Sequence, residues 1–258
     1  MLFSILVVSL NPGIKLKETV ESVLCQSFGD YEILIKDGLS TDGCLEQIPA
    51  DDRIRILKQK DTSIYDAMNQ AVEAAKGEYF LFLNCGDLLY DETVLHKVAA
   101  AVDGKGVDIL YGDLERRDVP GRITAPSEIT DFVCYRNIPC HQVCFYKRSM
   151  FAERAYDINY PVRADYEHFL YCKYKKNAKF YYLPEIISKY EGGGFSENKE
   201  QMKQSAKEHK AITKKYLGKK AGKYRLIMIL TLQPLRAKIA GSKHFSKTYQ
   251  KLKGTVQK

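Results

Sequence analysis

Residues 4–43, SILVVSLNPGIKLKETVESVLCQSFGDYEILIKDGLSTDG, contain the pattern that decides the fold. An apolar run over 2–9 stops just before Asn11, and a second apolar run covers 31–36. Between them, apolar residues recur at helical spacing across 15–27. We therefore predict a strand, a helix and a second strand, which together form the βαβ unit of a parallel sheet.

The same alternation continues along the chain. Further strands are predicted at 53–57, 79–83, 107–111, 122–125, 143–146 and 180–183, and further helices at 64–75, 94–102, 166–174 and 199–216. The run over 79–83 is almost wholly apolar, as expected for a strand buried on both faces. The sequence thus predicts an α/β protein with a mostly parallel mixed sheet flanked by helices.

The composition excludes several classes of protein. The chain has 258 residues, of which 45% are hydrophobic and 28% charged, so it is neither disordered nor collagen-like. Its seven cysteines are odd in number and never spaced as C-x-x-C, which argues against disulfides and a zinc ribbon and favours a reducing, cytoplasmic setting. The apolar N-terminus lacks a basic segment and a small-residue cleavage site, so we interpret it as a strand and not as a signal peptide.

Charge is distributed unevenly. Residues 199–258 contain 17 Lys and Arg against two acids, whereas the whole chain has a net charge of only +8. A near-neutral to acidic body therefore precedes a strongly basic tail. Such a tail attracts an anionic partner, either a membrane surface or a nucleic acid. Its apolar segment is too short to span a membrane, so we expect a helix lying on an anionic lipid surface, with a solvated basic helix as the alternative.

Polar residues follow the predicted strands at their carboxyl ends, where open α/β sheets bind ligands. Ser9 and Asn11 follow the first strand, Asp37 follows the second, and Asn84 and Asp87 follow the strand at 79–83. No glycine-rich dinucleotide or P-loop motif is present, so nucleotide phosphates would need another partner. A divalent cation, Mg or Mn, held by a carboxylate would serve.

At this point the sequence resembles a known family. The opening stretch is similar to that of family-2 glycosyltransferases with the GT-A fold, and the region around SIYDAMNQAVEAAKGEYFLFLNCGD resembles the branch found in colanic-acid and capsule biosynthesis. PCHQVCFYKRSMF, ADYEHFLYC and EGGGFSEN match later motifs of that branch in the same order. The resemblance implies a Rossmann-like GT-A domain over 1–198, with a nucleotide-binding half at about 1–112 and an acceptor-binding half at about 113–198, followed by the basic tail at 199–258.

The resemblance also implies a donor site. Asp37 would accept a hydrogen bond from the uracil or thymine ring of a nucleotide-sugar, with Ser9 and Asn11 lining the same base pocket. The alternatives are an Asx-type turn for Asp37 and ordinary turn residues for the other two. Asp66 and Asn69 would contact the donor, unless Asp66 belongs to a capping box with Ser63.

The metal and phosphate positions follow in the same way. Asp87 is the single acid left at the D-x-D position and would coordinate the cation; its alternative role is a loop cap before a helix at Glu92. Asn84 and His141 are assigned to donor binding, His141 through the diphosphate or the acceptor sugar. The alternative for His141 is a buried structural histidine, because the neighbouring cysteines do not fit a zinc site.

Asp165 matches the family's catalytic base. One carboxylate suffices for a single-displacement, inverting transfer, although an N-cap role for the helix at 166–174 is the alternative. Gly193, Gly194 and Ser196 would belong to a loop that closes over the diphosphate, or else to a plain linker.

The sequence therefore predicts an inverting glycosyltransferase that moves a sugar from a nucleotide-sugar, with UDP as the default nucleotide, to a lipid-linked or oligosaccharide acceptor in capsule, exopolysaccharide or lipopolysaccharide synthesis. We expect it at the inner face of the cell membrane, as a peripheral protein. A non-catalytic sugar-nucleotide-binding relative, a nucleotidyltransferase and a nucleic-acid-binding protein are the alternatives, and the oligomeric state, including a homo-oligomer, stays open.

Overall fold

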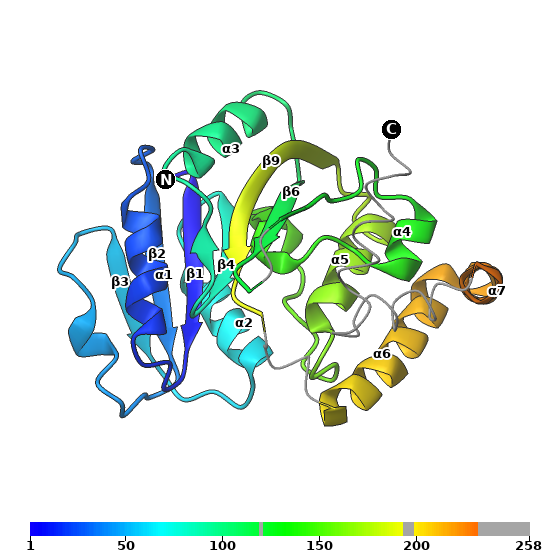
Figure 1. Ribbon diagram of the computed structural model, residues 1–258, viewed down its shortest axis with the longest axis horizontal. Coiled ribbons are helices and arrows are strands. Elements are labelled where there is room, and N and C mark those ends of the chain that lie inside the picture. The colour runs from blue at the N-terminus through cyan, green and yellow to red at the C-terminus, as the bar shows by residue number, and fades with distance from the viewer. Residues whose placement is uncertain (119–120, 193–198, 232–258) are drawn as a thin grey trace. The chain divides into compact units, whose positions relative to one another are not determined.

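The computed structural model describes residues 1–118, 121–192 and 199–231 (Figure 1). The chain divides into two compact units, residues 1–212 and 213–258. Helix α6 (Lys199–Leu217) crosses this boundary. Its first part belongs to unit 1 because the Glu208 carboxylate accepts the backbone N–H groups of Val162 at 3.1 Å and Arg163 at 2.8 Å. The sequence places the start of the basic tail at residue 199, and this boundary and the division of the body into two halves stay predictions.

Nine strands form one mixed sheet within the described residues, in the order β3-β2-β1-β4-β8-β6-β9-β5, with β7 paired to β6. The strands are β1 (Phe3–Ser9), β2 (Tyr31–Asp37), β3 (Ile54–Lys58), β4 (Tyr79–Asn84), β5 (Leu88–Leu89), β6 (Ile109–Arg116), β7 (Arg122–Ile123), β8 (Cys144–Lys147) and β9 (Phe180–Tyr190). This is the α/β sheet that the alternating pattern predicts.

The first four strands in this order are parallel and in register. Phe3 pairs with Tyr31 and Tyr79, and Ser9 pairs with Asp37, so the carboxyl ends of β1, β2 and β4 reach the same edge. The order reverses at β1, because β2 lies on one side of it and β4 on the other. Such a reversal opens a crevice beyond the strand ends, and this is where ligands bind in open α/β sheets.

The second half of the sheet is less regular. Strand β8 runs antiparallel between β4 and β6, while β6 and β9 are parallel and include a register shift near Asp113. Because β8 and β9 reach the crevice from this side, residues late in the chain lie next to the ends of the early strands. The crevice is thus lined from both halves of the sheet.

The helices connect these strands. They are α1 (Lys15–Leu24), α2 (Ile64–Ala74), α3 (Val94–Val102), α4 (Asp131–Arg136), α5 (Ala164–Tyr174), α6 and α7 (Lys219–Leu230), with short 3-10 turns at Leu45–Gln47, His141–Val143 and Arg148–Met150. Helix α2 packs on β1 and β2. None of the described helices is long and apolar enough to cross a membrane.

Some boundaries differ from the sequence prediction. Helix α1 ends at Leu24, and not at Ser27, because Gln26 and Ser27 donate side-chain hydrogen bonds to the carbonyls of Asp91 at 2.6 Å and Glu92 at 3.0 Å. Strand β9 is much longer than the predicted 180–183, and the pattern predicted neither β5 nor α4. These elements are short or depend on partners distant in the sequence.

The sheet edge opposite the crevice carries a structural network. Glu32 is buried and accepts hydrogen bonds from the Ser4 hydroxyl and the Lys76 amide, both at 2.6 Å, and it pairs with Arg55. Next to it, Gly77 packs on β1 so closely that a Cβ would lie 2.4 Å from the Ser4 nitrogen. This edge is filled by protein groups and serves stability.

Candidate active site

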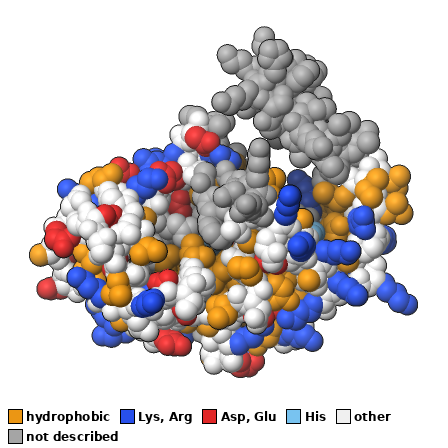
Figure 2. Space-filling model, turned by 90° about the horizontal axis from the view of Figure 1, so that it is seen from below, with side chains coloured by type: hydrophobic (Ala, Val, Ile, Leu, Met, Phe, Trp, Pro, Cys, Tyr) orange, Lys and Arg blue, Asp and Glu red, His pale blue; other side chains and the backbone are white. Residues whose placement is uncertain are grey.

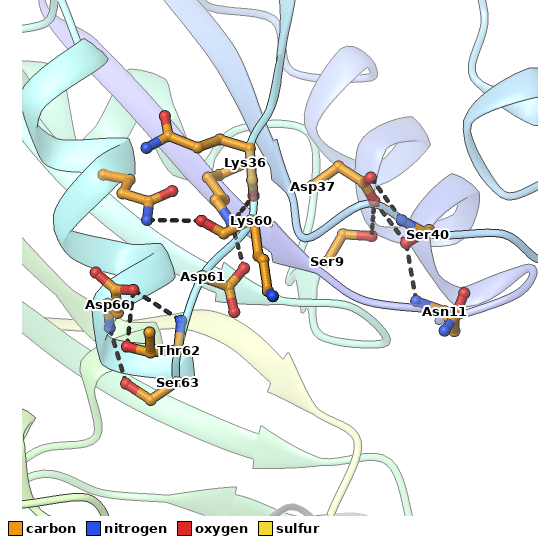
Figure 3. Close-up of polar contacts among 12 residues, drawn as sticks. Ser9, Asn11, Lys36, Asp37, Ser40, Lys60, Asp61, Thr62, Ser63 and Asp66 are labelled. Atoms are coloured by element: carbon orange, nitrogen blue, oxygen red, sulfur yellow. Dashed lines mark hydrogen bonds and ion pairs between the residues drawn. The ribbon is translucent and has the colours of Figure 1, made fainter.

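The predicted base-pocket residues lie together at the ends of β1 and β2 (Figure 3). Asp37 is fully buried and accepts hydrogen bonds from the Ser40 hydroxyl at 2.6 Å, the Ser40 amide at 2.8 Å and the Ser9 hydroxyl at 3.3 Å. The backbone N–H of Asn11 donates to the Ser40 hydroxyl at 2.9 Å. The side-chain oxygen of Asn11 accepts from the backbone N–H of Thr41. These are the contacts of the turn interpretation, and the donor contacts of all three residues stay predictions.

The structure confirms the helix cap at Ser63. The Ser63 hydroxyl accepts from the Asp66 amide at 3.2 Å, and the Asp66 carboxylate accepts from the Thr62 amide at 2.8 Å and hydroxyl at 2.9 Å. In a capping box the Asp66 carboxylate would accept from the backbone N–H of the N-cap residue, Ser63. Here it accepts from the backbone N–H of Thr62, the residue before the N-cap, which is a variant of that motif. Asn69 pairs through both ends of its amide with the backbone of Tyr156, at 2.9 Å each. Both residues therefore have structural partners, and their donor contacts stay predictions.

A chain of hydrogen bonds connects the carboxyl end of β4 with the start of α5. The Asn84 amide lies 3.2 Å from Nε2 of His141, whose Nδ1 lies 3.1 Å from Oδ2 of Asp165. The Tyr65 hydroxyl donates to Oδ1 of Asp165 at 2.8 Å. Asn84, His141 and Asp165 were predicted from sequence, whereas Tyr65 was not, although it lies inside the SIYDAMN motif. Its place on the buried face of α2 gave no sign that its hydroxyl reaches Asp165.

Asp165 is held as a carboxylate. Burial by itself raises the pKa of this group, but hydrogen bonds from His141, Tyr65 and the Tyr166 amide outweigh it, and the pKa lies below its ordinary value. The side chain is still 24% exposed, so a substrate hydroxyl can reach it. An ionised, accessible carboxylate has the properties of a general base.

Asp165 does not act as an N-cap. Helix α5 begins at Ala164, one residue before Asp165, and the N-cap position is Arg163, which makes no side-chain cap bond. The capping alternative is therefore wrong, because the helix starts earlier than the sequence indicates. His141 lies in a 3-10 turn and not at the start of a strand, and this turn directs its ring toward Asp165.

Asp87 lies in the turn after β4 and is 2% exposed. Its carboxylate accepts from the Gln142 amide at 3.2 Å and from the Glu191 backbone N–H at 3.0 Å, so it joins the end of β9 to the site. Burial raises its pKa, although these hydrogen bonds partly offset the effect. Helix α3 begins at Val94, and Asp91, not Asp87, binds the Thr93 amide there. The loop-cap alternative is therefore wrong for Asp87.

The described residues form no preassembled metal site. Across 1–118, 121–192 and 199–231, no three His, Cys, Asp or Glu side chains are grouped so that they could hold one. At the D-x-D position, the single carboxylate of Asp87 already accepts two hydrogen bonds from protein groups. The metal-binding role of Asp87 stays a prediction. Gly193, Gly194 and Ser196, the predicted closing loop, lie outside the described residues.

Two hollows meet at Asp165. A small pocket of about 160 Å³ extends toward β4 and α2, and a groove of about 800 Å³ extends toward α4 and α6. The residues that line both are His141, Gln142, Val162, Asp165 and Tyr190. Asp165 is the one carboxylate among them, so a group in either hollow can approach it. Glu191 closes the small pocket at its other side, where it covers Gly86 and pairs with Lys15 at 2.9 Å.

A mixed sheet whose strand order reverses at β1, with a carboxylate shared by two hollows at the carboxyl edge of its parallel strands, defines an α/β protein that binds its ligands at that edge. Comparison with known proteins makes this specific. Residues 4–178 match the profile described as Glycosyl transferase family 2, and the chain belongs to this family. It is a glycosyltransferase enzyme with a GT-A-like mixed α/β fold, as the sequence predicts; its assignment to the colanic-acid branch stays a prediction.

The chain is similar to a "PGL/p-HBAD biosynthesis glycosyltransferase" of Mycobacterium bovis, with 34% identity over 203 residues that cover 76% of this chain and 79% of the relative. It is also similar to "Glycosyltransferase GlyG" of Streptococcus pneumoniae, with 31% identity over 122 residues, or 45% of this chain and 40% of the relative. Both relatives are thus glycosyltransferases by name.

Two groups of solved structures share the fold. S. aureus TarS 1-349 in complex with UDP-GlcNAc superimposes with a TM-score of 0.58 at 20% identity. The superposition covers 79% of this chain and 64%, or less than two thirds, of the TarS chain. Glucosyl-3-phosphoglycerate synthase from Mycobacterium tuberculosis, in complex with Mn2+, UDP and phosphoglyceric acid, gives a TM-score of 0.60 at 11% identity, with 84% of this chain and 78% of that chain covered.

Proposed function

We propose that this protein is an inverting glycosyltransferase that moves a sugar from a nucleotide-sugar, with UDP as the nucleotide, to a hydroxyl of a lipid-linked saccharide in polysaccharide or glycolipid synthesis. The observation that carries the proposal is the position of Asp165 between the two hollows. The donor occupies the small pocket and the crevice at the ends of β1, β2 and β4, and the acceptor occupies the groove. The UDP and UDP-GlcNAc bound by structural neighbours support the choice of nucleotide.

The reaction is a single displacement. The acceptor hydroxyl oxygen attacks the anomeric carbon, the bond from that carbon to the diphosphate oxygen breaks, and the hydroxyl proton passes to the Asp165 carboxylate. His141 and Tyr65 each hold one oxygen of this carboxylate, and they keep it ionised and oriented. No second carboxylate lines both hollows within the described residues, in agreement with a mechanism that needs no covalent intermediate.

The groove supports an amphipathic acceptor. Its wall combines the cationic Arg136 and Arg163 with apolar side chains such as Ile138 and Met202. Arg163 is fixed in place by the Ser205 hydroxyl at 2.7 Å. An acceptor with a sugar or phosphate head and an apolar chain suits such a wall.

We also propose contact with an anionic membrane surface. Lys and Arg side chains are spread over the face shown in Figure 2, and α6 adds the exposed Lys203, Lys207 and Lys214. In α7, the four basic residues Lys219, Lys220, Lys223 and Arg225 precede the exposed Leu226, Ile229 and Leu230. A helix that joins lysines to exposed apolar residues suits an interface with lipid headgroups. Sedimentation with anionic vesicles, but not with neutral vesicles, tests this part; equal sedimentation with both would contradict it.

A divalent cation is part of the proposal only as a companion of the donor. Structural neighbours contain Mn2+ together with a nucleotide or a nucleotide-sugar, which supports a cation that enters with the diphosphate. When bound there, it would neutralise developing charge on the leaving group, with Asp87 at the D-x-D position as the candidate ligand.

The test of the function is the variant Asp165→Asn. We expect it to bind UDP as the wild type does and to lose sugar transfer, because an amide cannot accept the hydroxyl proton. The matched control is Asp157→Asn, since Asp157 lies in a loop outside both hollows. Transfer that survives in Asp165→Asn would overturn the assignment of the base, and donor binding without turnover in the wild type would favour the non-catalytic alternative.

A further inference from the structure

We propose that Glu208 is a positioning residue of the active site, which acts from helix α6 on the backbone that carries Asp165. The basic tail expected at 199–258 contains residue 208, and residues 4–178, which match the family profile, do not. The inference rests on the proposed function, because the role of Asp165 as the base is part of that proposal. It makes the first part of α6 a component of the active site.

The Glu208 side chain forms a buried bridge between α6 and the start of α5. Glu208 is 4% exposed, and its Oε2 accepts the backbone N–H groups of Val162 at 3.1 Å and Arg163 at 2.8 Å. Gln204, one turn earlier in α6, donates to the other oxygen at 2.9 Å. Both carboxylate oxygens are therefore held, and Oε2 is directed at the two residues that precede α5.

A short backbone path joins these two residues to Asp165. The Arg163 carbonyl accepts from the backbone N–H of Glu167 at 2.9 Å and so begins α5, in which Asp165 is the second residue. The Val162 carbonyl oxygen lies 3.1 Å from the Tyr65 hydroxyl, which also donates to Oδ1 of Asp165 at 2.8 Å. The segment 162–165 is thus held by α6 through its N–H groups and by Tyr65 through a carbonyl. A shift of Val162 would therefore move Asp165 relative to Tyr65.

A local cap would have been enough for the helix alone. A Ser, Thr, Asp or Asn at position 163 would accept an N–H group of the first turn of α5. The chain has Arg163 there, which makes no cap bond and whose Nε donates to the Ser205 hydroxyl at 2.7 Å and carbonyl at 3.0 Å. Burying the Glu208 carboxylate is costly unless it is hydrogen-bonded. The entry to α5 is therefore held at three points by one helix that lies 42 to 46 positions away in the sequence.

The same helix forms a wall of the groove in which we place the acceptor. The side chains of α6 that line this groove are Met202, Ser205, Ala206 and His209. Asp165 lies where the groove meets the small pocket. Because Glu208 belongs to the helix of the wall and holds the entry to α5, it fixes the position of the base relative to the acceptor. Such placement matters, since a misplacement of about 1 Å can lower a rate about a hundredfold.

The experiment compares Glu208→Leu with Glu208→Gln by NMR. The side-chain oxygen of glutamine can still accept both N–H groups, whereas leucine leaves them without an acceptor. The first readout is hydrogen exchange of the Val162 and Arg163 amides. Exchange should be about tenfold faster or more in Glu208→Leu and should stay near the wild-type rate in Glu208→Gln.

The second readout reports on the base itself. A carboxylate only accepts hydrogen bonds, so Nδ1 of His141 carries the proton in its contact with Asp165. The resonance of this proton, assigned by its loss in His141→Gln, should be the same in the wild type and Glu208→Gln. It should shift or disappear in Glu208→Leu, because Asp165 moves. A residue that only held α6 against the body would leave this resonance unchanged.

The matched control is Ile212→Ala, which removes fully buried apolar packing from the same helix but none of the hydrogen bonds of Glu208. It should keep the wild-type resonance even where its melting temperature falls as far as that of Glu208→Leu. Where Glu208→Leu does not fold, Glu208→Asp, whose carboxylate is one methylene shorter, should show the same changes to a smaller degree.

Three results would overturn the inference and leave the proposed function intact. They are an unchanged resonance in Glu208→Leu and Glu208→Asp, an equal change in Ile212→Ala, and failure of Glu208→Gln to keep the wild-type exchange rates and resonance. Absence of the resonance from the wild type would overturn it as well. Failure of the wild type to bind UDP in a calorimetric titration would overturn the proposed function, and the two NMR readouts would still decide the role of Glu208.

Discussion

Removal of the Tyr65 hydroxyl should change the acidity of Asp165, the proposed catalytic base. The same hydroxyl also contacts the Val162 carbonyl at 3.1 Å. In Tyr65→Phe, Oδ1 of Asp165 loses a donor at 2.8 Å and keeps only the Tyr166 amide, also at 2.8 Å. Burial, which favours the neutral acid, is unchanged because the ring remains in place. The pKa of Asp165 should therefore rise toward or above its ordinary value.

The size of the effect follows from the strength of the lost hydrogen bond. A hydrogen bond to a charged group contributes about 1.5–3 kcal/mol. One pKa unit corresponds to about 1.4 kcal/mol, so the pKa of Asp165 should rise by about 1 to 2 units. In the wild type the folded-state pKa is depressed, so the ionised carboxylate stabilises the protein at neutral pH, and this contribution is lost as the pH falls through the folded-state pKa. The variant should have less of this stabilisation.

The assay has two independent readouts. NMR titration of the aspartate carboxyl carbons, with Asp165→Asn to assign the resonance, gives the pKa without any substrate. The pH profile of kcat/KM should show its acid limb displaced to higher pH by the same amount. Tyr181→Phe is the matched control, because the Tyr181 ring contacts Lys105 and its hydroxyl makes no hydrogen bond in the described parts of the chain. An unchanged Asp165 pKa in Tyr65→Phe would refute the reasoning.

Three further predictions concern stability and cation binding. Glu32→Gln should lower the free energy of unfolding at neutral pH by about 1–3 kcal/mol and should flatten the decrease of this free energy in acid. The reason is that hydrogen bonds from Ser4, the Lys76 amide and Arg55 outweigh burial and lower the pKa of Glu32. Equal urea midpoints at neutral and acidic pH in both proteins would contradict this. Gly77→Ala should lower the melting temperature through a backbone clash with β1 costing about 1–3 kcal/mol, whereas Gly29→Ala, with open space around it, should not. Manganese alone should leave the melting temperature unchanged and should raise it only together with UDP, because no cluster of ligands is preassembled among the described residues; a rise with manganese alone would show a resident site.

The part of the site that follows strand ends could be predicted from the sequence. Ser9, Asp37 and Asn84 end or follow apolar runs, and parallel pairing in register is enough to place them at one edge. The same argument found Asp87 near the crevice. The sequence could not show which carboxylate oxygens of Asp37 and Asp87 already accept hydrogen bonds. Their donors, the Ser40 hydroxyl, the Gln142 side chain and the Glu191 backbone N–H, come from other segments of the chain.

Local patterns thus determined the parallel βαβ half of the sheet, because periodicity of apolar residues reports which face of an element is buried. Only the tertiary structure placed β8 antiparallel between β4 and β6, and this brought residues 65, 141 and 165 into one chain of hydrogen bonds. Tyr65 and Asp165 are 100 positions apart, and no short-range pattern records such a contact. The sequence alone proposed Asp165 as the base. Its contacts with Tyr65 and His141 and its position between two hollows depend on packing between distant segments, which is a property of the folded chain as a whole.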